Sequence, residues 1–305
     1  MQASRTSFKK WSLVLGIIPA VFLQLTLGIG PSIATFILSF TDISGVKGVP
    51  WKFIGLANYR ELFFQQNSRD LIQVIQNTII FCVAVTVIQN LIAIFIALAL
   101  NSKMIRGRSF YRSVVFMPSV LGVLVTSLVW LCVLNPMDGP VAKFIGLFGL
   151  QSGFFKSNSS ALACVIFTQI WMAMGHSMVI NLAGLQSIPN ELYEAGEIDG
   201  TSGWQKFRYI TFPLLWPTIN VNILLAVIGS LQSFQIILFT TGGRNMATQT
   251  LAARVVYYAF NINAGSGAAA MRQGYGAAWA MFLFVFILTA TLIYVRAMKR
   301  REELT

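Results

Sequence analysis

Charged residues are scarce in this chain and unevenly distributed along it. Of its 305 residues, 10% are Asp, Glu, Lys or Arg and 56% are hydrophobic, whereas a soluble domain carries roughly 25% charged residues. Charges this few cannot cover a water-facing surface, which excludes an ordinary soluble domain. Long charge-free gaps recur along the chain, and each exceeds the ~20 apolar residues that cross a bilayer as a helix.

These gaps predict an all-α membrane protein with six transmembrane helices. Helices are required because lipid cannot satisfy exposed backbone polar groups, and the runs are too long and uniform for the alternating strands of a barrel. The first span is expected to be retained, since its charge-free run is too long for a secretory signal peptide. The predicted spans are residues 13–39, 73–99, 114–135, 161–186, 215–239 and 276–296.

The segments between the spans carry turn signals and short apolar runs. They predict a short interfacial helix around 58–64, a short surface helix around 144–150 and a loop over 240–275. Pro118 is expected near the start of the third span, where a proline costs little because its missing donor would be unpaired anyway.

Basic residues exceed acidic ones, giving a formal net charge of +12. In a membrane protein, such an excess usually sets topology, so we expect contact with membrane lipid and no nucleic-acid partner. The basic residues gather at the N-terminus (Arg5, Lys9, Lys10), within 101–112 and at the C-terminus. With six spans these three segments share one side, which predicts that both termini and the loop 187–214 are cytoplasmic.

Groups that perform chemistry are missing from the predicted spans. Apart from Arg296, the last residue of the sixth, no Asp, Glu, Lys or Arg lies in them, although ion-driven carriers generally need ionisable groups near the midplane. The single histidine, His176, is expected to be a helix-packing hydrogen bonder. No Gly-x-x-x-x-Gly-Lys-Ser/Thr loop is present, so the chain cannot bind ATP in that mode. A stand-alone secondary carrier and a membrane-embedded enzyme are therefore weaker alternatives than a conduit driven by another protein.

Cysteine gives little evidence of a further function. Cys82, Cys132 and Cys164 all fall in predicted spans, which indicates buried small hydrophobic side chains and neither a disulfide nor a metal site. We expect no catalytic residue, no metal and no cofactor bound by this chain.

One polar segment, residues 188–215, concentrates four of the ten acidic residues between Glu191 and Asp199. It predicts two short helices joined by a glycine turn, with Pro189 in the first turn and Gly200 ending the first helix. Ser202 with Gln205 forms a capping box for the second helix. The charge pattern alone fits both a solvated connection and a helix offered to a cytoplasmic partner.

The segment resembles the EAA loop of binding-protein-dependent ABC importer permeases. The residues that carry the resemblance are Glu194-Ala195-Gly196, Asp199-Gly200 and Ile210-Thr211-Phe212-Pro213. Their surroundings are similar to the carbohydrate-uptake branch, and specifically to its maltose-permease-F-like and glycerol-phosphate-permease-A-like subunits. Gly196 departs from the family's usual alanine, and Arg244 with Asn245 departs from the tract that follows the fifth span.

The resemblance implies a type I ABC importer permease fold in a bacterial inner membrane. The permease core would occupy 71–297, after an N-terminal segment 1–70 with the first span and before a basic cytoplasmic tail 298–305. The chain would not be an enzyme. Its implied partners are a second homologous permease subunit in a heterodimer, two copies of an ATPase that uses ATP and Mg, and an extracytoplasmic solute-binding protein. The residues implied to couple to the ATPase are Glu191, Glu194, Ala195, Gly196, Asp199 and Gly200.

The implied solute is a sugar or polyol, with glycerol phosphate or an acidic oligosaccharide as the alternative. Sugars need hydrogen-bonding and aromatic groups, and the candidates in the fourth and fifth spans are Trp171, Asn222, Ser230, Gln232, Ser233 and Gln235, with Gln169, Asn181 and Asn220 beside them. Any single amide could instead join helices together. The dense group of Gln232, Ser233 and Gln235 is the favoured solute site.

Overall fold

The computed structural model describes residues 16–46, 48–64, 68–102, 105–150, 153–158, 160–242, 246–260 and 271–302. Within these ranges the chain forms helices and no β-strand, apart from one isolated bridge between Thr41 and Phe53. The predictions that rest on Arg5, Lys9, Lys10, Lys103, Arg244 and Asn245 lie outside the described residues.

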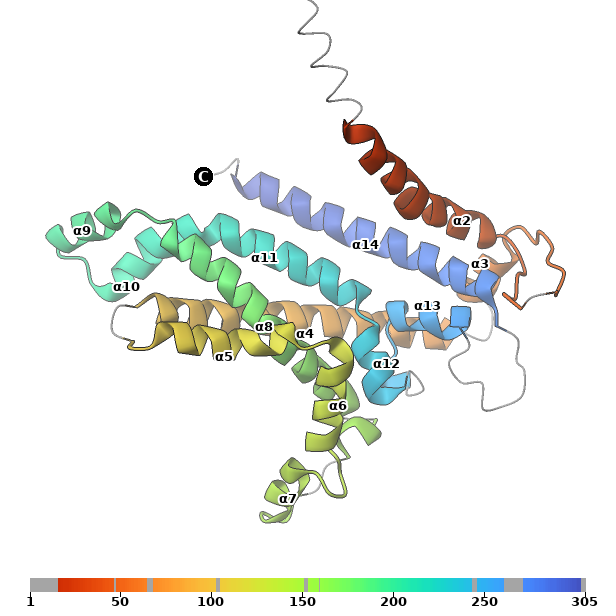
Figure 1. The fold of residues 1–305 in the computed structure, drawn as a ribbon, viewed down its shortest axis with the longest axis horizontal. Coiled ribbons are helices and arrows are strands. Elements are labelled where there is room, and N and C mark those ends of the chain that lie inside the picture. Colours follow the sequence, from red (N-terminus) through yellow and green to blue (C-terminus); the bar gives the residue numbers. More distant parts are fainter. Residues whose placement is uncertain are drawn as a thin grey trace, which may run out of the picture. The chain divides into compact units, whose positions relative to one another are not determined.

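The helical elements are labelled in Figure 1. In chain order they are η1 (Gln24–Ile29), α2 (Gly30–Leu38), α3 (Ala57–Phe64), α4 (Ser68–Asn101), α5 (Arg108–Val120), α6 (Val123–Val133), α7 (Pro140–Gly146), η2 (Phe154–Lys156), α8 (Ala161–Gln186), α9 (Asn190–Ile198), α10 (Gly203–Lys206), η3 (Phe207–Thr211), α11 (Phe212–Gln232), α12 (Gln235–Thr241), η4 (Met246–Thr248), α13 (Leu251–Phe260) and α14 (Gln273–Glu302).

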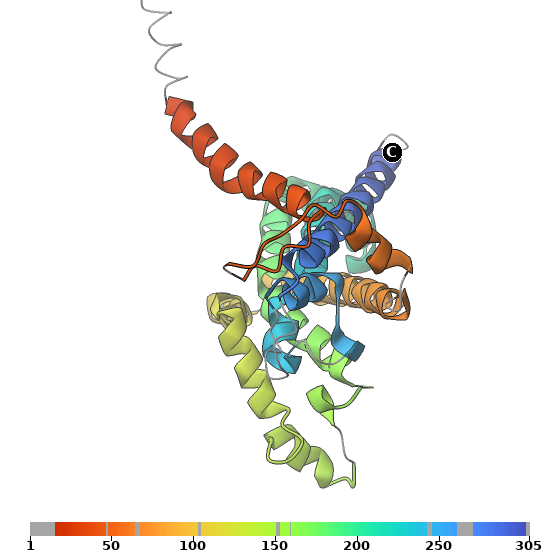
Figure 2. The ribbon, with the colours of Figure 1, turned by 90° about the vertical axis from the view of Figure 1, so that its right-hand side faces the viewer.

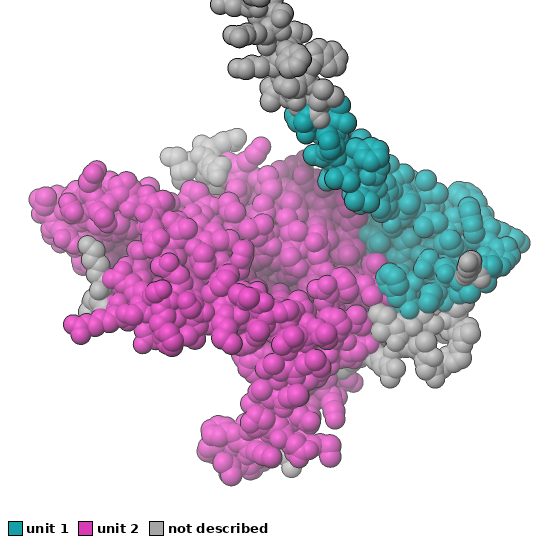
Figure 3. Space-filling view, viewed as in Figure 1, with its two compact units in different colours: residues 1–67, 257–282 teal, residues 68–256, 283–305 magenta. Residues whose placement is uncertain are grey.

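The chain divides into two compact units, each of which is described by itself (Figure 3). Unit 1 comprises Met1–Asn67 and Tyr257–Phe282, and unit 2 comprises Ser68–Val256 and Leu283–Thr305. In unit 1, Arg272 forms an ion pair with Glu61, and hydrogen bonding to that carboxylate raises the pKa of the Arg272 guanidinium. Asn58 donates hydrogen bonds to the carbonyl oxygens of Ser39 and Thr41.

Most of the predicted spans are confirmed as long apolar helices. In the described part of the chain, five helices are long and apolar enough to cross a membrane, and a bent pair makes a sixth candidate. The predicted spans 73–99, 161–186 and 276–296 lie within α4, α8 and α14, and a continuous helix over 16–38 matches the described part of the first span.

The prediction of one continuous third span over 114–135 is wrong. Two helices, α5 and α6, bend by 99° at this place, and Figures 1 and 2 show α6 turning away from the direction of α5. Leu121 and Gly122 between them have extended backbones. Pro118 lies near the end of α5 and not near a helix start, so its missing N–H and the flexibility of Gly122 both weaken the helix there.

Three further predictions about connections need correction. The fifth span ends at Gln232, and Ser233 has an extended backbone before α12 begins. The segment 240–275 is not simply a loop, because it contains α13. The predicted surface helix near 144–150 starts earlier, at Pro140, which occupies a first-turn position.

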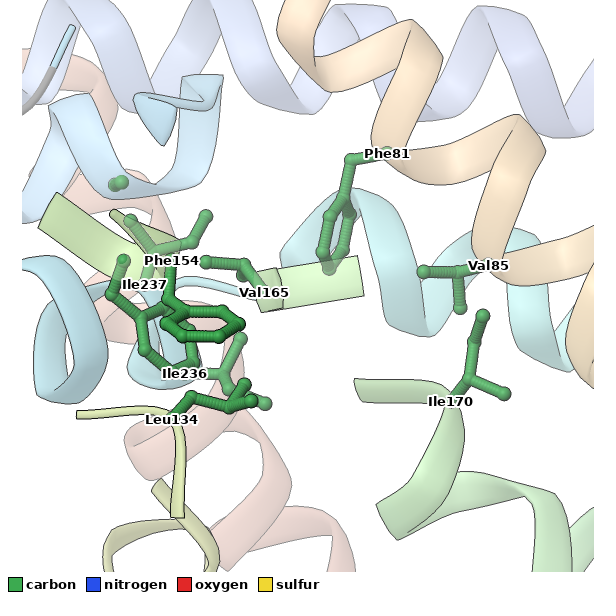
Figure 4. Close-up of a cluster of buried hydrophobic side chains, with 10 residues drawn as sticks. Phe81, Val85, Leu134, Phe154, Val165, Ile170, Ile236 and Ile237 are labelled. Carbon is green, nitrogen blue, oxygen red and sulfur yellow. The ribbon is translucent and has the colours of Figure 1, made fainter. Parts of the chain in front are cut away.

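The core of unit 2 is built where α4, α8 and α11 pack together. Figure 4 shows one buried cluster in which Phe81 and Val85 of α4 meet Val165 and Ile170 of α8, beside Ile236 of α12. Of the cysteines, Cys82 is buried and Cys164 is half-buried, but Cys132 is exposed, contrary to the prediction of burial for all three.

Glycines bring the helix backbones of this core close together. A Cβ added at Gly175 of α8 would lie 2.5 Å from the carbonyl oxygen of Val115 in α5, and one at Gly184 would lie 2.6 Å from Oγ1 of Thr218 in α11. Small residues at helix contacts permit the close packing that holds helices together in lipid.

Candidate functional site

The acidic segment forms the predicted short first helix and glycine turn, but the second helix is not short, because it continues into the fifth span. Helix α9 begins after Pro189, whose backbone is extended (ψ 133°), and Glu191 lies in its first turn. Asp199 ends the helix, and Gly200 follows with φ +72°. That left-handed conformation favours glycine, because in any other residue the Cβ atom would come too close to the backbone carbonyl oxygen.

The second helix, α10, starts with the predicted capping box. Oγ of Ser202 accepts from the backbone N–H of Gln205, and the Gln205 side chain accepts from the backbone N–H of Ser202. From Gly203 the chain continues without interruption through the π-helical turn η3 into α11, forming one helix of 30 residues. Figure 1 shows α9 and α10 at the end of unit 2, beyond the ends of α8 and α11.

The surface of this loop carries both acidic and apolar side chains. Glu191, Glu194, Ala195 and Asp199 are exposed, and Gly196 is the buried residue of α9. Ile198 is 87% exposed and Trp204 is 70% exposed. Such large exposed apolar side chains, close to acidic groups, are typical of a protein-binding or lipid-binding surface.

A cavity of about 420 Å³ lies among α4, α5, α8 and α11 in unit 2. The polar residues that line it are Gln89, Ser119, Gln169, His176, Ser177, Asn222 and Ser230. Its apolar lining includes Phe116, Met172 and Leu225. No Asp, Glu, Lys or Arg is among the described residues that line it.

Several of the polar side chains that line this cavity are hydrogen-bonded to one another around Ser177. Nε2 of Gln89 donates to Oγ of Ser177 over 2.8 Å, and Nδ2 of Asn222 donates to the backbone oxygen of Ser177 over 3.1 Å. Oγ of Ser119 donates to the backbone oxygen of Met172. These hydrogen bonds join α4, α5 and α11 to α8 and use part of the hydrogen-bonding capacity of Gln89, Ser119 and Asn222.

Two further polar side chains of the cavity wall, Gln169 and His176, are on α8. Gln169 accepts from Oγ of Ser233 through its Oε1, which leaves its NH₂ group for the cavity. His176 is an exposed residue of the cavity wall. Since residues at i and i+7 share a helix face, Gln169 and His176 present donors and acceptors along one line.

The predicted solute residues are separated by the structure. Asn222 and Ser230 line the cavity. Ser233 contacts it only through Gln169, and Trp171 packs its ring against Trp130 with centroids 5.5 Å apart. Gln232 and Gln235 flank the break between α11 and α12 and are exposed away from the lining. Their role as solute contacts stays a prediction.

Sequence reasoning missed part of the lining. Gln89 lines the cavity from the second span, outside the fourth and fifth spans that were predicted to hold the solute residues, although a glutamine in a charge-free run is itself a signal of an interior polar contact. His176 was expected to pack between helices, whereas it lines the cavity. The sequence does not distinguish a histidine that packs between helices from one that lines a cavity, because the two differ only in whether a neighbouring helix or an open space faces the imidazole.

Comparison with known proteins gives the class of this chain. Residues 89–302 match the model of the family described as binding-protein-dependent transport system inner membrane component. The chain therefore belongs to this family of membrane permease components.

Particular relatives are similar over most of their length. The chain is 32% identical over 256 residues to the multiple sugar-binding transport system permease protein of Streptococcus mutans serotype c, covering 84% of this chain and 86% of that protein. It is 31% identical over 222 residues to the sn-glycerol-3-phosphate transport system permease protein of Agrobacterium fabrum, covering 72% and 74%.

A solved structure shares the fold. It is that of a bacterial alginate ABC transporter in complex with an alginate pentasaccharide-bound periplasmic protein, and one of its chains superposes with a TM-score of 0.81. The match covers 97% of this chain and 96% of that one at 21% identity. The two chains therefore share the ABC permease architecture.

The cavity geometry predicts that His176 is reached by water. In a background with Cys82, Cys132 and Cys164 replaced by alanine, we expect His176→Cys to react with a charged thiol reagent roughly tenfold faster than Met178→Cys, because reactivity follows exposure. Met178 is a matched control, since it lies two residues away on the same helix with no exposed surface. Labelling rates are measured by mass spectrometry; equal rates at both positions would contradict an open cavity.

Proposed function

We propose that this chain is the membrane-spanning permease subunit of an ABC importer that passes a sugar or polyol delivered by an extracytoplasmic binding protein. The family membership supports the general role, and the cavity between α4, α8 and α11 supplies the path. The chain itself would bind no cofactor. ATP and Mg would be used by two copies of a partner ATPase, and a second homologous permease subunit would complete the pore.

The chemistry of the cavity supports an uncharged polyhydroxy solute. Its described lining offers amides, hydroxyls and one imidazole beside apolar and aromatic surfaces, without Lys or Arg. A phosphate or carboxylate solute would usually be matched by a cationic group. Weak, distributed hydrogen bonds also suit a pathway, because a solute must leave it as readily as it enters.

One observation favours the alternative of an anionic solute, such as glycerol phosphate or an acidic oligosaccharide. A second cavity, of about 950 Å³, is lined by residues of α4, α6, η2, α12 and η4 in unit 2. Lys156, Gln73 and Asn158 line it, and no Asp or Glu is among its described lining residues. Lys156 could attract an anion to this second cavity. The first cavity, however, has no Lys or Arg in its described lining to bind an anion, so a neutral solute remains the first proposal.

The loop of α9 and α10 is proposed as the surface on which the ATPase pushes. Its exposed acids could fix the register of a partner, and its exposed Ile198 and Trp204 could bury apolar surface against protein or lipid. The orientation proposed from the basic residues puts this loop, with both termini, on the cytoplasmic side of a bacterial inner membrane.

Copurification tests the proposed assembly. We expect an affinity-tagged chain, expressed with its neighbouring genes, to copurify with a second permease and with an ATPase that contains a phosphate-binding loop. The measurement is the subunit composition and ATPase activity of the purified complex. Solute uptake by the isolated chain in an ion gradient would contradict the proposal and support a secondary carrier.

The two solute classes are distinguished by two single substitutions. If the solute is neutral, Gln169→Leu should lower the uptake rate at saturating binding protein by about fivefold, because one hydrogen bond of ~1 kcal/mol is lost, and Lys156→Gln should change it little. Uptake of labelled solute in reconstituted vesicles is the measurement. Loss of uptake in Lys156→Gln with normal uptake in Gln169→Leu would support the anionic alternative.

Gly200 tests the role of the loop in coupling. Gly200→Val should lower solute transported per ATP hydrolysed by at least about fivefold, because a β-branched residue at positive φ costs ~1–3 kcal/mol and would displace α9. Gly200→Asn is the matched control, since asparagine tolerates this conformation. Transport and ATP hydrolysis are measured on the same vesicles, and an unchanged ratio in Gly200→Val would rule out the coupling role.

A further inference from the structure

Polar contacts tie the segment around η4 and the start of α13 to α4. Nδ2 of Asn77 donates to the backbone oxygens of Met246 and Gln249, over 2.9 and 3.1 Å. The backbone N–H of Leu251 donates to Oγ1 of Thr78 over 3.0 Å. Asn77, Thr78, Gln249 and Leu251 are buried, and buried polar groups whose hydrogen bonds are made hold a structure rigidly. The backbone of Met246 therefore has a fixed place beside α4.

Arg254, in the first turn of α13, is a buried cation with two neighbours of unequal strength. The residue is 6% exposed, and its Nη2 lies 3.2 Å from Oδ2 of Asp70 in the first turn of α4. The same nitrogen lies 2.7 Å from Sδ of Met246. A carboxylate is a strong acceptor for a charged donor, whereas a thioether sulfur is a weak one. Of these two contacts, the ion pair with Asp70 is therefore the stronger.

Met246 is reached through the second cavity. The residue is half-buried and lines this cavity of about 950 Å³ together with Gln73, Lys156 and Asn158. A water molecule takes only about 30 Å³ of liquid volume, so a small oxidant such as hydrogen peroxide has room to enter. Met246 thus lies between an open cavity and a buried guanidinium.

Three other methionines show why position 246 is distinct. Met137 is 78% exposed, so an oxygen added to its sulfur would be hydrated. Met172 lines the first cavity, whose described lining contains no Lys or Arg. Met178 has no exposed surface, so an oxidant does not reach it in the folded chain. Of these four methionines, Met246 combines access for an oxidant with a cation beside its sulfur.

We propose that Met246 is a site of reversible oxidation by peroxide, and that Arg254 converts this oxidation into a change of structure. The sulfur attacks one oxygen of hydrogen peroxide, so that an S–O bond forms and the O–O bond breaks. The proton on the transferred oxygen passes to the departing hydroxide, which leaves as water. The sulfur is oxidised to the sulfoxide and the peroxide is reduced. Methionine sulfoxide reductases reverse the reaction.

The oxidised side chain competes for the guanidinium of Arg254. Oxidation turns the apolar thioether into a polar sulfoxide, whose oxygen accepts hydrogen bonds more strongly than the sulfur does. Because the backbone of Met246 is held beside α4, this oxygen stays close to Nη2 of Arg254 and draws it from Asp70. Weakening a buried ion pair is destabilising, since it leaves a buried charge less well compensated. The start of α13 is thereby loosened from α4, whatever solute the chain transports.

The oxidation is measured on the assembled complex treated with hydrogen peroxide. Peptide mass spectrometry follows the oxidised fraction of each methionine, and we expect Met246 to react at least about tenfold faster than Met178, because oxidation requires access. Hydrogen exchange of the Leu251 amide, which donates to Thr78, should then become at least about fivefold faster, since exchange reports local opening. Treatment with sulfoxide reductases for both epimers should restore slow exchange.

Three variants separate this site from general oxidative damage. Met246→Leu keeps a similar volume without an oxidisable sulfur, so its Leu251 amide should exchange slowly after peroxide treatment. Met137→Leu is the matched control, since it removes a more exposed sulfur and should respond like the natural chain. Met246→Gln places an amide oxygen beside Arg254 and should speed exchange at Leu251 without any oxidant.

Three results would overturn the inference. They are an oxidation rate of Met246 no higher than that of Met178, an unchanged exchange rate of the Leu251 amide once the sulfoxide has formed, and an equal response of Met246→Leu and the natural chain. If Met246→Leu does not assemble, Met246→Gln decides the matter. Slow exchange of the Leu251 amide in that variant would show that Arg254 does not respond to an oxygen at this place, which also overturns the inference.

Discussion

The contact of α8 with α4 and α11 is the interaction on which the rest of unit 2 depends. In lipid, helices gain no hydrophobic free energy by associating, so close packing and interhelical hydrogen bonds must hold them. Gly184 provides close packing against α11, Gly175 provides it against α5, and Ser177 accepts hydrogen bonds from α4 and α11. Interhelical hydrogen bonds average about 0.6 kcal/mol each in a membrane protein, so these bonds orient helices whose association depends mainly on packing.

The same contact has a functional consequence, because it divides the polar side chains into two groups. Gln89 and Asn222 each use one amide N–H in a hydrogen bond to Ser177, whereas Gln169 bonds Ser233 through its oxygen and lines the cavity together with His176. A polar side chain in a span can thus form an interhelical hydrogen bond or face the proposed solute path, depending on which group lies next to it. The proposed path is accordingly built on α8, with α4, α5 and α11 as its other walls.

The two proposed sites lie on a continuous element. Helix α11 borders the cavity, and at its other end it continues through η3 and α10 to the packed contact with α9. From Gly203 to Gln232 this helix is uninterrupted. The π-helical turn within it is a feature often found at functional positions of helices.

The sequence by itself determined the membrane class, most of the spans and the structure of the loop. Long charge-free runs form helices in lipid, because only a helix pairs all the backbone polar groups within one segment. The capping box and Gly200 act on neighbouring backbone atoms, so the local sequence was sufficient to predict them. The bend between α5 and α6 was not predicted, because an apolar run indicates a span but does not indicate whether its helix is straight. Pro118 and Gly122 are weak signals of a break, because proline and glycine are tolerated in membrane helices.

Only the tertiary structure decided which polar side chains meet. Gln89 is 88 residues from Ser177, and His176 differs from a packing histidine only in facing a cavity. These relations depend on how helices pack against one another, which the composition and spacing of a single segment do not contain.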